Sequence, residues 1–246
     1  MSVTKKRALA MLLAAGLCQA VALSQSLLPP TEANLSKNPA LVDDWVNRLQ
    51  ASEPKERANA EDALVEAAGR SLPLLKRFIT REHQDLHALA FEIIQRIGPP
   101  AIPLLANLLG HEWYAIRRSA VSELIDLAPQ TEGIQPALRR ALGDDDANVA
   151  GDAARALGAL GKRASPSVGA LVTTLSHQDP YVRVYAAEAL ASIGPSAAKA
   201  TPALAAALAD PIPGVRWAAC EGLAGIGPAA QSAVPQLIEA LADDFL

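Results

Sequence analysis

A proline or glycine followed by a leucine two residues later recurs six times along the chain. The successive spacings are 30, 33, 33, 33 and 33, at Pro73, Pro103, Pro136, Gly169, Pro202 and Pro235. The leucines are Leu75, Leu105, Leu138, Leu171, Leu204 and Leu237. A fixed period of this length is typical of a solenoid, in which each repeat stacks only on its neighbours. The sequence therefore predicts a stack of about six repeats.

Each repeat is predicted to hold two helices, because its apolar residues follow a helical rather than an alternating period. In the fifth repeat, the apolar residues that share one helical face are Val182, Ala186, Ala189, Leu190 and Ile193. Asp179 is placed to cap this helix, and Pro180 suits its first turn. Gly194-Pro195 suits its end, with the glycine predicted to adopt a left-handed C-cap conformation before a turn into the second helix.

Two short motifs mark the helix boundaries. Three first helices begin with an apolar residue and arginine, at Ile116-Arg117, Val182-Arg183 and Val215-Arg216. Ile-Gly-Pro stands at the end of a first helix three times, at residues 97–99, 193–195 and 226–228. This pattern resembles the HEAT-repeat family, particularly the short, alanine-rich repeats of its bilin-lyase-like branch. The resemblance covers about Glu53 to Leu246 and implies an all-α solenoid, a HEAT-like superhelix. In the family, the arginine commonly bonds an aspartate between repeats, so Ala150 in the fourth repeat and His87 in the second predict an interrupted Asp–Arg ladder.

The solenoid is predicted to occupy residues 40–246. Its repeats are expected to begin near residues 53, 82, 112, 145, 179 and 211. A capping helix over residues 40–50 is predicted to cover the first repeat, because Leu41, Trp45 and Leu49 share one helical face. Half of the residues are hydrophobic but only 4% are aromatic, which suits thin helix pairs packed through alanine and leucine.

The N-terminus has the pattern of an export signal. Basic residues at 5–7 precede an uncharged apolar run, and Ala20-Val21-Ala22 places small residues where a signal peptidase cleaves. We predict a signal peptide over residues 1–22 and a flexible linker over residues 23–39, which contain proline, serine and asparagine. The apolar run is shorter than the ~20 residues of a spanning helix, which favours cleavage and a periplasmic or secreted protein. The alternative is an uncleaved N-terminus that tethers the chain to a membrane.

The charge of the chain restricts its partners. Cleavage near Ala22 would remove Lys5, Lys6 and Arg7 and no acidic residue, so the net charge would change from −4 to −7. An acidic protein is not a general binder of nucleic acid or of anionic membranes. We therefore expect a protein partner, no nucleic acid, and no membrane span in the mature chain.

Few residues suggest chemistry, and we predict no catalytic residue, no metal site and no cofactor. His83 and His87 could lie on one helical face, but two ligands do not make a metal site. His111-Glu112 resembles one iron-binding pair of the HEAT-fold deoxyhypusine hydroxylases, which repeat such pairs, whereas this chain has one. The run 144–146 lacks the spacing of a calcium loop, so its aspartates are interpreted as helix caps. Cys220 is interpreted as a small buried hydrophobic residue.

The second helices are the candidate binding surface, because in the resembled fold they line the concave side. The residues three and four positions after the repeat proline should point away from the buried leucines. The candidate partner-binding residues are Lys76, Arg77, Asn107, Arg139, Arg140 and Thr173. Basic residues gather in the first three repeats, which favours an extended acidic peptide or a partner helix. Ordinary solvated surface charge is the alternative interpretation.

Two functions remain open at this stage. The first is a non-catalytic scaffold that mediates protein–protein interaction in an exported compartment. The second, implied by the resemblance, is a bilin-lyase-like enzyme or lyase-accessory subunit that acts on a chromophore-binding protein. The export signal counts against the second function.

Overall fold

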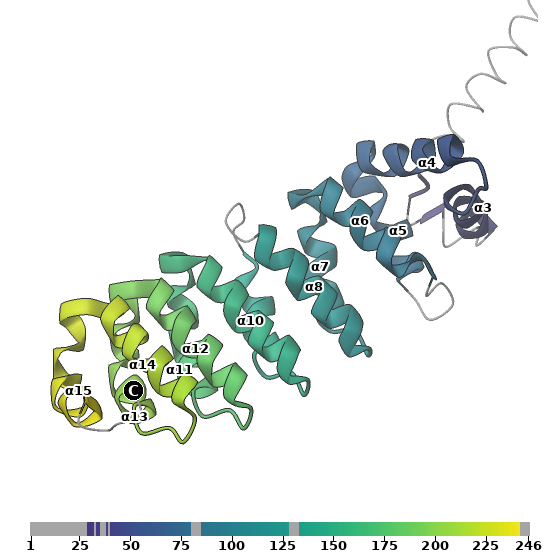
Figure 1. Cartoon of the computed structure of the whole chain (residues 1–246). Helices are drawn as coiled ribbons and strands as arrows, with labels where there is room; N and C mark the ends of the chain where they lie inside the picture. Colours follow the sequence, from purple (N-terminus) through teal and green to yellow (C-terminus); the bar gives the residue numbers. More distant parts are fainter. Residues whose placement is uncertain are drawn as a thin grey trace, which may run out of the picture. The chain divides into compact units, whose positions relative to one another are not determined.

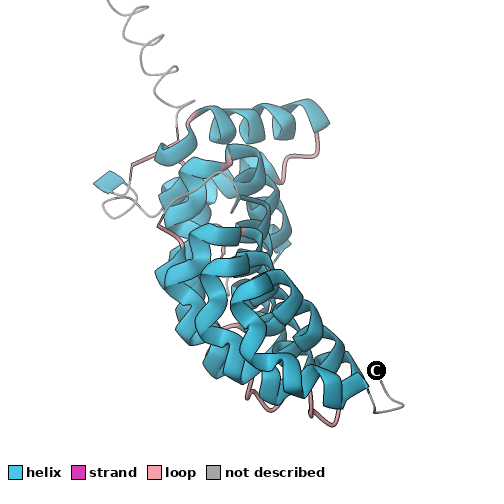
Figure 2. Ribbon diagram, turned by 90° about the vertical axis from the view of Figure 1, so that its left-hand side faces the viewer, coloured by secondary structure: helices cyan, strands magenta, loops and turns pink. Residues whose placement is uncertain are grey.

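The computed structural model is all-helical, which confirms the predicted fold class. It describes residues 29–31, 33–34, 38, 40–79, 85–127 and 133–241. Every regular element within these ranges is a helix (Figure 2). The predicted signal peptide and most of the predicted linker lie outside the described residues. The chain divides into two compact units, Met1–Ala101 and Ile102–Leu246, and each is described by itself.

The elements of the first unit with defined bounds are four α-helices and two short 3-10 helices (Figure 1). They are α3 (Ala40–Leu49), α4 (Pro54–Glu66), η1 (Ala68–Arg70), α5 (Leu72–Phe78), α6 (His87–Ile97) and η3 (Pro99–Ala101). Helix α3 packs on α4 and α5, and it buries Trp45 and Leu49. Leu41, the third residue of its expected apolar face, is half-buried. The core of this unit is therefore formed by the apolar sides of short helices.

The described part of the second unit is one second helix followed by four helix pairs. Its α-helices are α7 (Ile102–Leu108), α8 (Tyr114–Leu127), α9 (Gln135–Ala141), α10 (Ala147–Ala159), α11 (Val168–Thr174), α12 (Pro180–Ile193), α13 (Thr201–Ala207), α14 (Pro213–Ile226) and α15 (Val234–Leu241). In each of the last three pairs, a 3-10 helix connects the first helix to the second. These connections are η5 (Gly161–Ser167), η6 (Gly194–Ala200) and η7 (Gly227–Ala233). The first helices α8, α10, α12 and α14 lie side by side, each packed on the next (Figure 1). This arrangement is an α-solenoid.

The repeated leucines form the core of this stack. Leu105, Leu138, Leu171 and Leu204 are completely buried, as the period predicts. The apolar face predicted for the fifth repeat is buried along its whole length on α12. Leu237 of the last pair is only half-buried, because the described residues contain no later helix to cover it.

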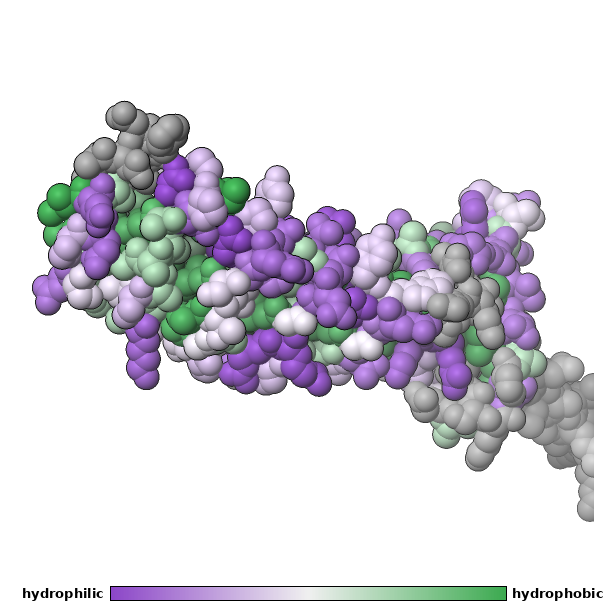
Figure 3. All heavy atoms as spheres, turned by 90° about the horizontal axis from the view of Figure 1, so that it is seen from below, coloured by the Kyte–Doolittle hydropathy of each residue, from purple (hydrophilic) through white to green (hydrophobic). Residues whose placement is uncertain are grey.

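The last pair also exposes apolar surface. Val234 and Ile238 of α15 are 47% and 63% exposed. Figure 3 shows hydrophobic side chains (green) reaching the surface among hydrophilic ones at this C-terminal end.

Small residues allow the first helices to approach closely. A Cβ atom on Gly225 of α14 would lie 2.5 Å from the carbonyl oxygen of Ala191 on α12. A Cβ atom on Gly158 of α10 would lie 3.1 Å from the Cα atom of Ala189. Contacts this short leave little room for larger side chains at these two positions, so the small residues there follow from the close approach of the first helices.

The helix ends follow local chemistry with one correction. Asp179 and Asp146 cap α12 and α10, because a carboxylate oxygen of each accepts the N–H of Tyr181 (2.8 Å) and of Asn148 (3.0 Å) respectively. Gly194, after α12, has φ 73° and ψ −144°, so the predicted left-handed C-cap is wrong in its ψ angle. This region of backbone conformation is open essentially to glycine alone. The residues that follow form the 3-10 helix η6 rather than a simple turn.

Candidate functional site

The predicted partner-binding residues all lie on second helices, but in separate compact units. Lys76 and Arg77 are exposed on α5 of the first unit. In the second unit, Asn107 on α7, Arg140 on α9 and Thr173 on α11 are exposed. These three occupy successive second helices of the stack and therefore line one series of repeats.

Arg139 has a different environment from its neighbour Arg140. Its side chain is half-buried and donates to the carbonyl oxygen of Pro166 in η5, at 3.2 Å. Gln135, one turn earlier on α9, donates to the carbonyl oxygen of Arg163 at 2.9 Å. Both side chains thus tie α9 to the 3-10 helix of the next repeat. Arg139 holds two repeats together, and Arg140 is the exposed cation of this helix.

A buried Asp–Arg pair joins the third repeat to the fourth. The guanidinium of Arg117 donates from Nε and Nη2 to the two carboxylate oxygens of Asp144, at 2.6 and 2.7 Å. Its Nη1 atom donates to the carbonyl oxygens of His111 (2.9 Å) and Glu112 (3.1 Å). One arginine therefore binds the loop before its own helix and the loop before the next first helix. Bidentate pairs of this kind fix geometry as well as charge.

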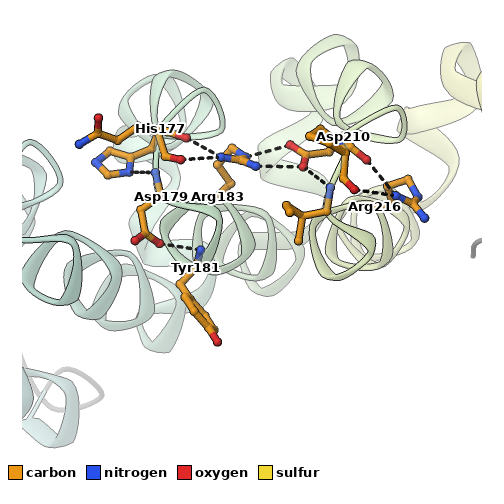
Figure 4. A network of polar contacts seen from close by, with 9 residues as sticks. His177, Asp179, Tyr181, Arg183, Asp210 and Arg216 are labelled. Atoms are coloured by element: carbon orange, nitrogen blue, oxygen red, sulfur yellow. Dashed lines mark hydrogen bonds and ion pairs between the residues drawn. The ribbon is translucent and has the colours of Figure 1, made fainter.

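The same arrangement joins the fifth repeat to the sixth (Figure 4). Arg183 donates to the carboxylate of Asp210 at 2.8 and 2.9 Å, and to the carbonyl oxygens of His177 and Gln178. Asp210 also accepts the N–H of Ile212 at 2.9 Å. Burial alone would raise the pKa of Asp210, but the hydrogen bonds from Arg183 and Ile212 outweigh it and hold the pKa below its usual value.

The interruption predicted at Ala150 is present, and a histidine accompanies it. Each observed pair is separated by 27 residues, and at the same distance after Ala150 stands His177 instead of aspartate. The Nδ1 atom of His177 accepts the N–H of Asp179 at 3.0 Å, which is the role that an Asp210 carboxylate oxygen has toward Ile212. Histidine thus replaces the hydrogen-bond acceptor of the loop where no arginine needs a carboxylate. Comparison of equivalent positions in successive repeats could have revealed this coupled change.

The other residues considered for chemistry do not form a site in the described part of the chain. No group of three or more potential metal ligands occurs within the described ranges, and His83 lies outside them. The Nδ1 atom of His111 accepts the N–H of Trp113 at 3.1 Å. Cys220 is half-buried rather than fully buried, and burial raises the pKa of its thiol, whereas a reactive thiol needs a lowered pKa. None of the described helices is both long enough and apolar enough to cross a membrane.

Comparisons with known proteins agree with the repeat architecture. The family model for HEAT repeats matches residues 168–245. The crystal structure of an engineered protein superposes on this chain with a TM-score of 0.52 and a sequence identity of 23%. The similarity covers 76% of this chain and 97% of that one. A designed armadillo repeat protein is 17% identical, with a TM-score of 0.49, over 76% of this chain and all of that one. No curated protein matches the chain.

The fold and the matched segment define the class of protein. Structural similarity at these identities establishes the fold alone, which is that of a helical repeat protein. The matched segment identifies the repeats of the C-terminal part more closely as HEAT repeats. The protein is a helical repeat protein with an α-solenoid fold, and proteins of this fold commonly bind partners on their extended repeat surfaces.

Proposed function

We propose that this protein is a non-catalytic scaffold that binds a partner protein through the surface of its second helices. The observation that carries the proposal is the exposure of Asn107, Arg140 and Thr173 on three successive second helices. Neighbouring helices pack about 8–10 Å apart, and an extended peptide advances about 3.3 Å per residue. About three peptide residues would therefore pass each repeat, so one short segment could contact several second helices.

The proposed partner segment is acidic. Lys76, Arg77 and Arg140 are exposed on second helices, whereas the whole chain has a net charge of −4. Exposed cations on an acidic protein favour encounter with an acidic partner and disfavour a basic one. The hydrogen bond of Arg139 to Pro166 supports a structural role for that residue, so the proposed contact relies on its exposed neighbours.

A site-specific photo-crosslinking experiment tests this surface. A photoreactive residue at Thr173 should yield an adduct with the partner in the native extracytoplasmic fraction. The same residue at Ser122, which is exposed on first helix α8, provides the matched control. An adduct at Ser122 and none at Thr173 would contradict binding by the second helices.

We also propose that the protein acts in an exported compartment after cleavage near Ala22. The basic residues at 5–7, the short apolar run and Ala20-Val21-Ala22 support this proposal. N-terminal sequencing of the protein from the extracytoplasmic fraction should begin near Leu23. Recovery of Met1 or Ser2 in a membrane fraction would instead support the uncleaved tether.

The second candidate is a bilin-lyase-like enzyme or lyase-accessory subunit. Its support is the resemblance of the short, alanine-rich repeats and of the Val182-Arg183 and Val215-Arg216 helix starts to that branch. A visible absorption spectrum of the purified protein distinguishes the two candidates. Bound tetrapyrrole would favour the lyase-like function, and a spectrum without visible absorption favours the scaffold.

A further inference from the structure

The exposed large apolar residues of the described chain gather in its last repeat. Six such residues are exposed in the described ranges, and four of them belong to this repeat: Ile212, Trp217, Val234 and Ile238. Helices α14 and α15 are the last pair of the stack (Figure 1), and no helix follows them within the described ranges. Exposed apolar surface that is concentrated in this way marks a site of protein contact.

The repeat period shows which residues of α14 would carry a further repeat. Three glycines of α14 identify the residues of α12 that face it, because a Cβ atom on each glycine would lie within 4 Å of them. These residues of α12 are Val184, Ala187 and Ala191. The period of 33 residues places Trp217, Cys220 and Ala224 at the same positions of α14. These three residues therefore form the stacking side of α14.

Helix α15 contributes the matching side of a second helix. Leu237 corresponds to Leu204 of α13, which is completely buried. Ile238 corresponds to Arg139 of α9, whose side chain bonds to the next repeat. Val234 occupies a position that is buried in the two preceding repeats, but it is 47% exposed here. We call the surface formed by these residues the terminal face; it consists of Trp217, Cys220, Ala224, Val234, Leu237 and Ile238.

The terminal face contains no charged residue, and the nearest carboxylates on its helices lie beside it. Glu221 on α14 and Glu239 on α15 are both exposed. Their equivalents one repeat earlier, Glu188 and Ala206, also remain exposed, although that repeat is covered by the next. These two positions thus stay in water when a repeat stacks. A partner could cover the terminal face without the cost of burying either carboxylate.

The α14 part of the terminal face is self-complementary. Trp217 precedes Cys220 by three residues and Ala224 follows it by four, so a large ring and a small side chain lie one helical turn to either side. In two antiparallel copies of α14 that cross at Cys220, the ring of each copy lies opposite Ala224 of the other. A two-fold axis at this point therefore pairs a large residue with a small one twice, as an isologous interface requires.

We propose that the terminal face binds the terminal face of a second copy of this chain, in a closed two-fold dimer. The proposed contact continues the interface between repeats, because equivalent residues such as Leu204 are buried there. In the first unit, helix α3 already packs on α4 and α5 and buries Trp45. A two-fold pairing covers both terminal faces at once and leaves neither free for further growth. This surface is independent of the one proposed above for an acidic segment.

Sedimentation equilibrium of the full chain tests the proposal. The mass of the parent should rise with concentration to twice the monomer mass and no further. Trp217→Asp and Ile238→Asp should each raise the Kd of the dimer at least about tenfold, because each would bury a charge in the contact. The matched control is Tyr181→Asp, since Tyr181 is 72% exposed on α12 outside the terminal face, and it should keep the parental Kd. Thermal melts verify that these exposed substitutions leave the fold intact.

A mixing experiment distinguishes two-fold contact from head-to-tail contact. Labelled parent is titrated with Trp217→Asp. In a two-fold dimer the altered face must meet the parental one, so the affinity should fall at least about tenfold. In a head-to-tail contact the variant would still offer its other, intact surface and bind with parental affinity, which would overturn the proposal.

Three further outcomes would overturn the proposal. A parent that stays monomeric at millimolar concentration would assign the terminal face to another occupant, either residues 242–246 of the same chain or a different protein. A parental Kd in Trp217→Asp or in Ile238→Asp would place the contact elsewhere. An equal loss in Tyr181→Asp would show a general effect of added charge.

Discussion

The substitution Asp210→Ala should destabilise the solenoid far more than the loss of an exposed ion pair. Arg183 and Asp210 form two hydrogen bonds, at 2.8 and 2.9 Å, and each side chain is only 12% exposed. Removal of the carboxylate leaves the guanidinium with little water and deprives the N–H of Ile212 of its acceptor. We expect the free energy of unfolding to fall by about 3 kcal/mol, the lower end of the cost of breaking a buried pair.

Asp62→Ala in the first unit is the matched control. Asp62 pairs with Arg96 at 2.5 Å, but these side chains are 61% and 43% exposed. An exposed pair contributes about 0.2–1 kcal/mol, so this variant should remain close to the parent. Urea unfolding followed by circular dichroism measures both changes. Equal losses in the two variants would refute the argument from burial.

The stabilisation by Asp210 should also depend on pH. Its pKa is lower in the folded protein, so its contribution is present above the unfolded value of about 3.9 and is lost as the pH falls through the folded value. The difference in stability between the parent and Asp210→Ala should therefore shrink below about pH 4. A difference that stays constant down to pH 2 would show that charge pairing is not its source.

Three further experiments test the packing and the polar contacts of the stack. Leu171→Ala removes a completely buried core leucine and should cost about 2–5 kcal/mol in urea unfolding, whereas a loss below ~1 kcal/mol would place this leucine outside the core. Glu123→Ala should raise the Tm, because one carboxylate oxygen is buried with no hydrogen-bond partner among the described residues. Burial, and after it the charge of Asp126, raise the pKa of Glu123, so the parent should gain stability as acid protonates this carboxyl. The variant lacks the carboxyl and should show no such gain. A lowered Tm in the variant would contradict the argument. Ala150→Arg with His177→Asp should rebuild the missing pair and show a favourable coupling of about 1 kcal/mol or more in a double-mutant cycle, whereas additive effects would exclude a new pair.

Much of the helix organisation could be predicted because it depends on short-range chemistry. A helical period specifies which residues of α12 share a face, so the burial of Val182 and Leu190 follows from their spacing alone. The cap by Asp179 is equally local, since a carboxylate needs only the N–H groups two or three residues ahead. The regular repeat period then places equivalent faces in every repeat.

Contacts between repeats could not be predicted in the same way, because they depend on how neighbouring helices approach. The bond from Arg139 to Pro166 distinguishes this arginine from the exposed Arg140, although both follow the same repeat proline. His177 stands 27 residues after Ala150, where each of the two observed pairs has an aspartate, and this is seen only when equivalent positions of successive repeats are compared.

The central claim is that exposed cations on the second helices bind an acidic partner segment. Its most direct test is the anisotropy of a labelled hexaglutamate peptide titrated with the full chain. The parent should bind saturably and more weakly as salt rises, and Arg140→Glu on α9 of the second unit should reduce the affinity. Arg118→Glu, which reverses an exposed cation on first helix α8, should bind like the parent. Parental affinity in Arg140→Glu, or no binding by the parent, would contradict the proposed function.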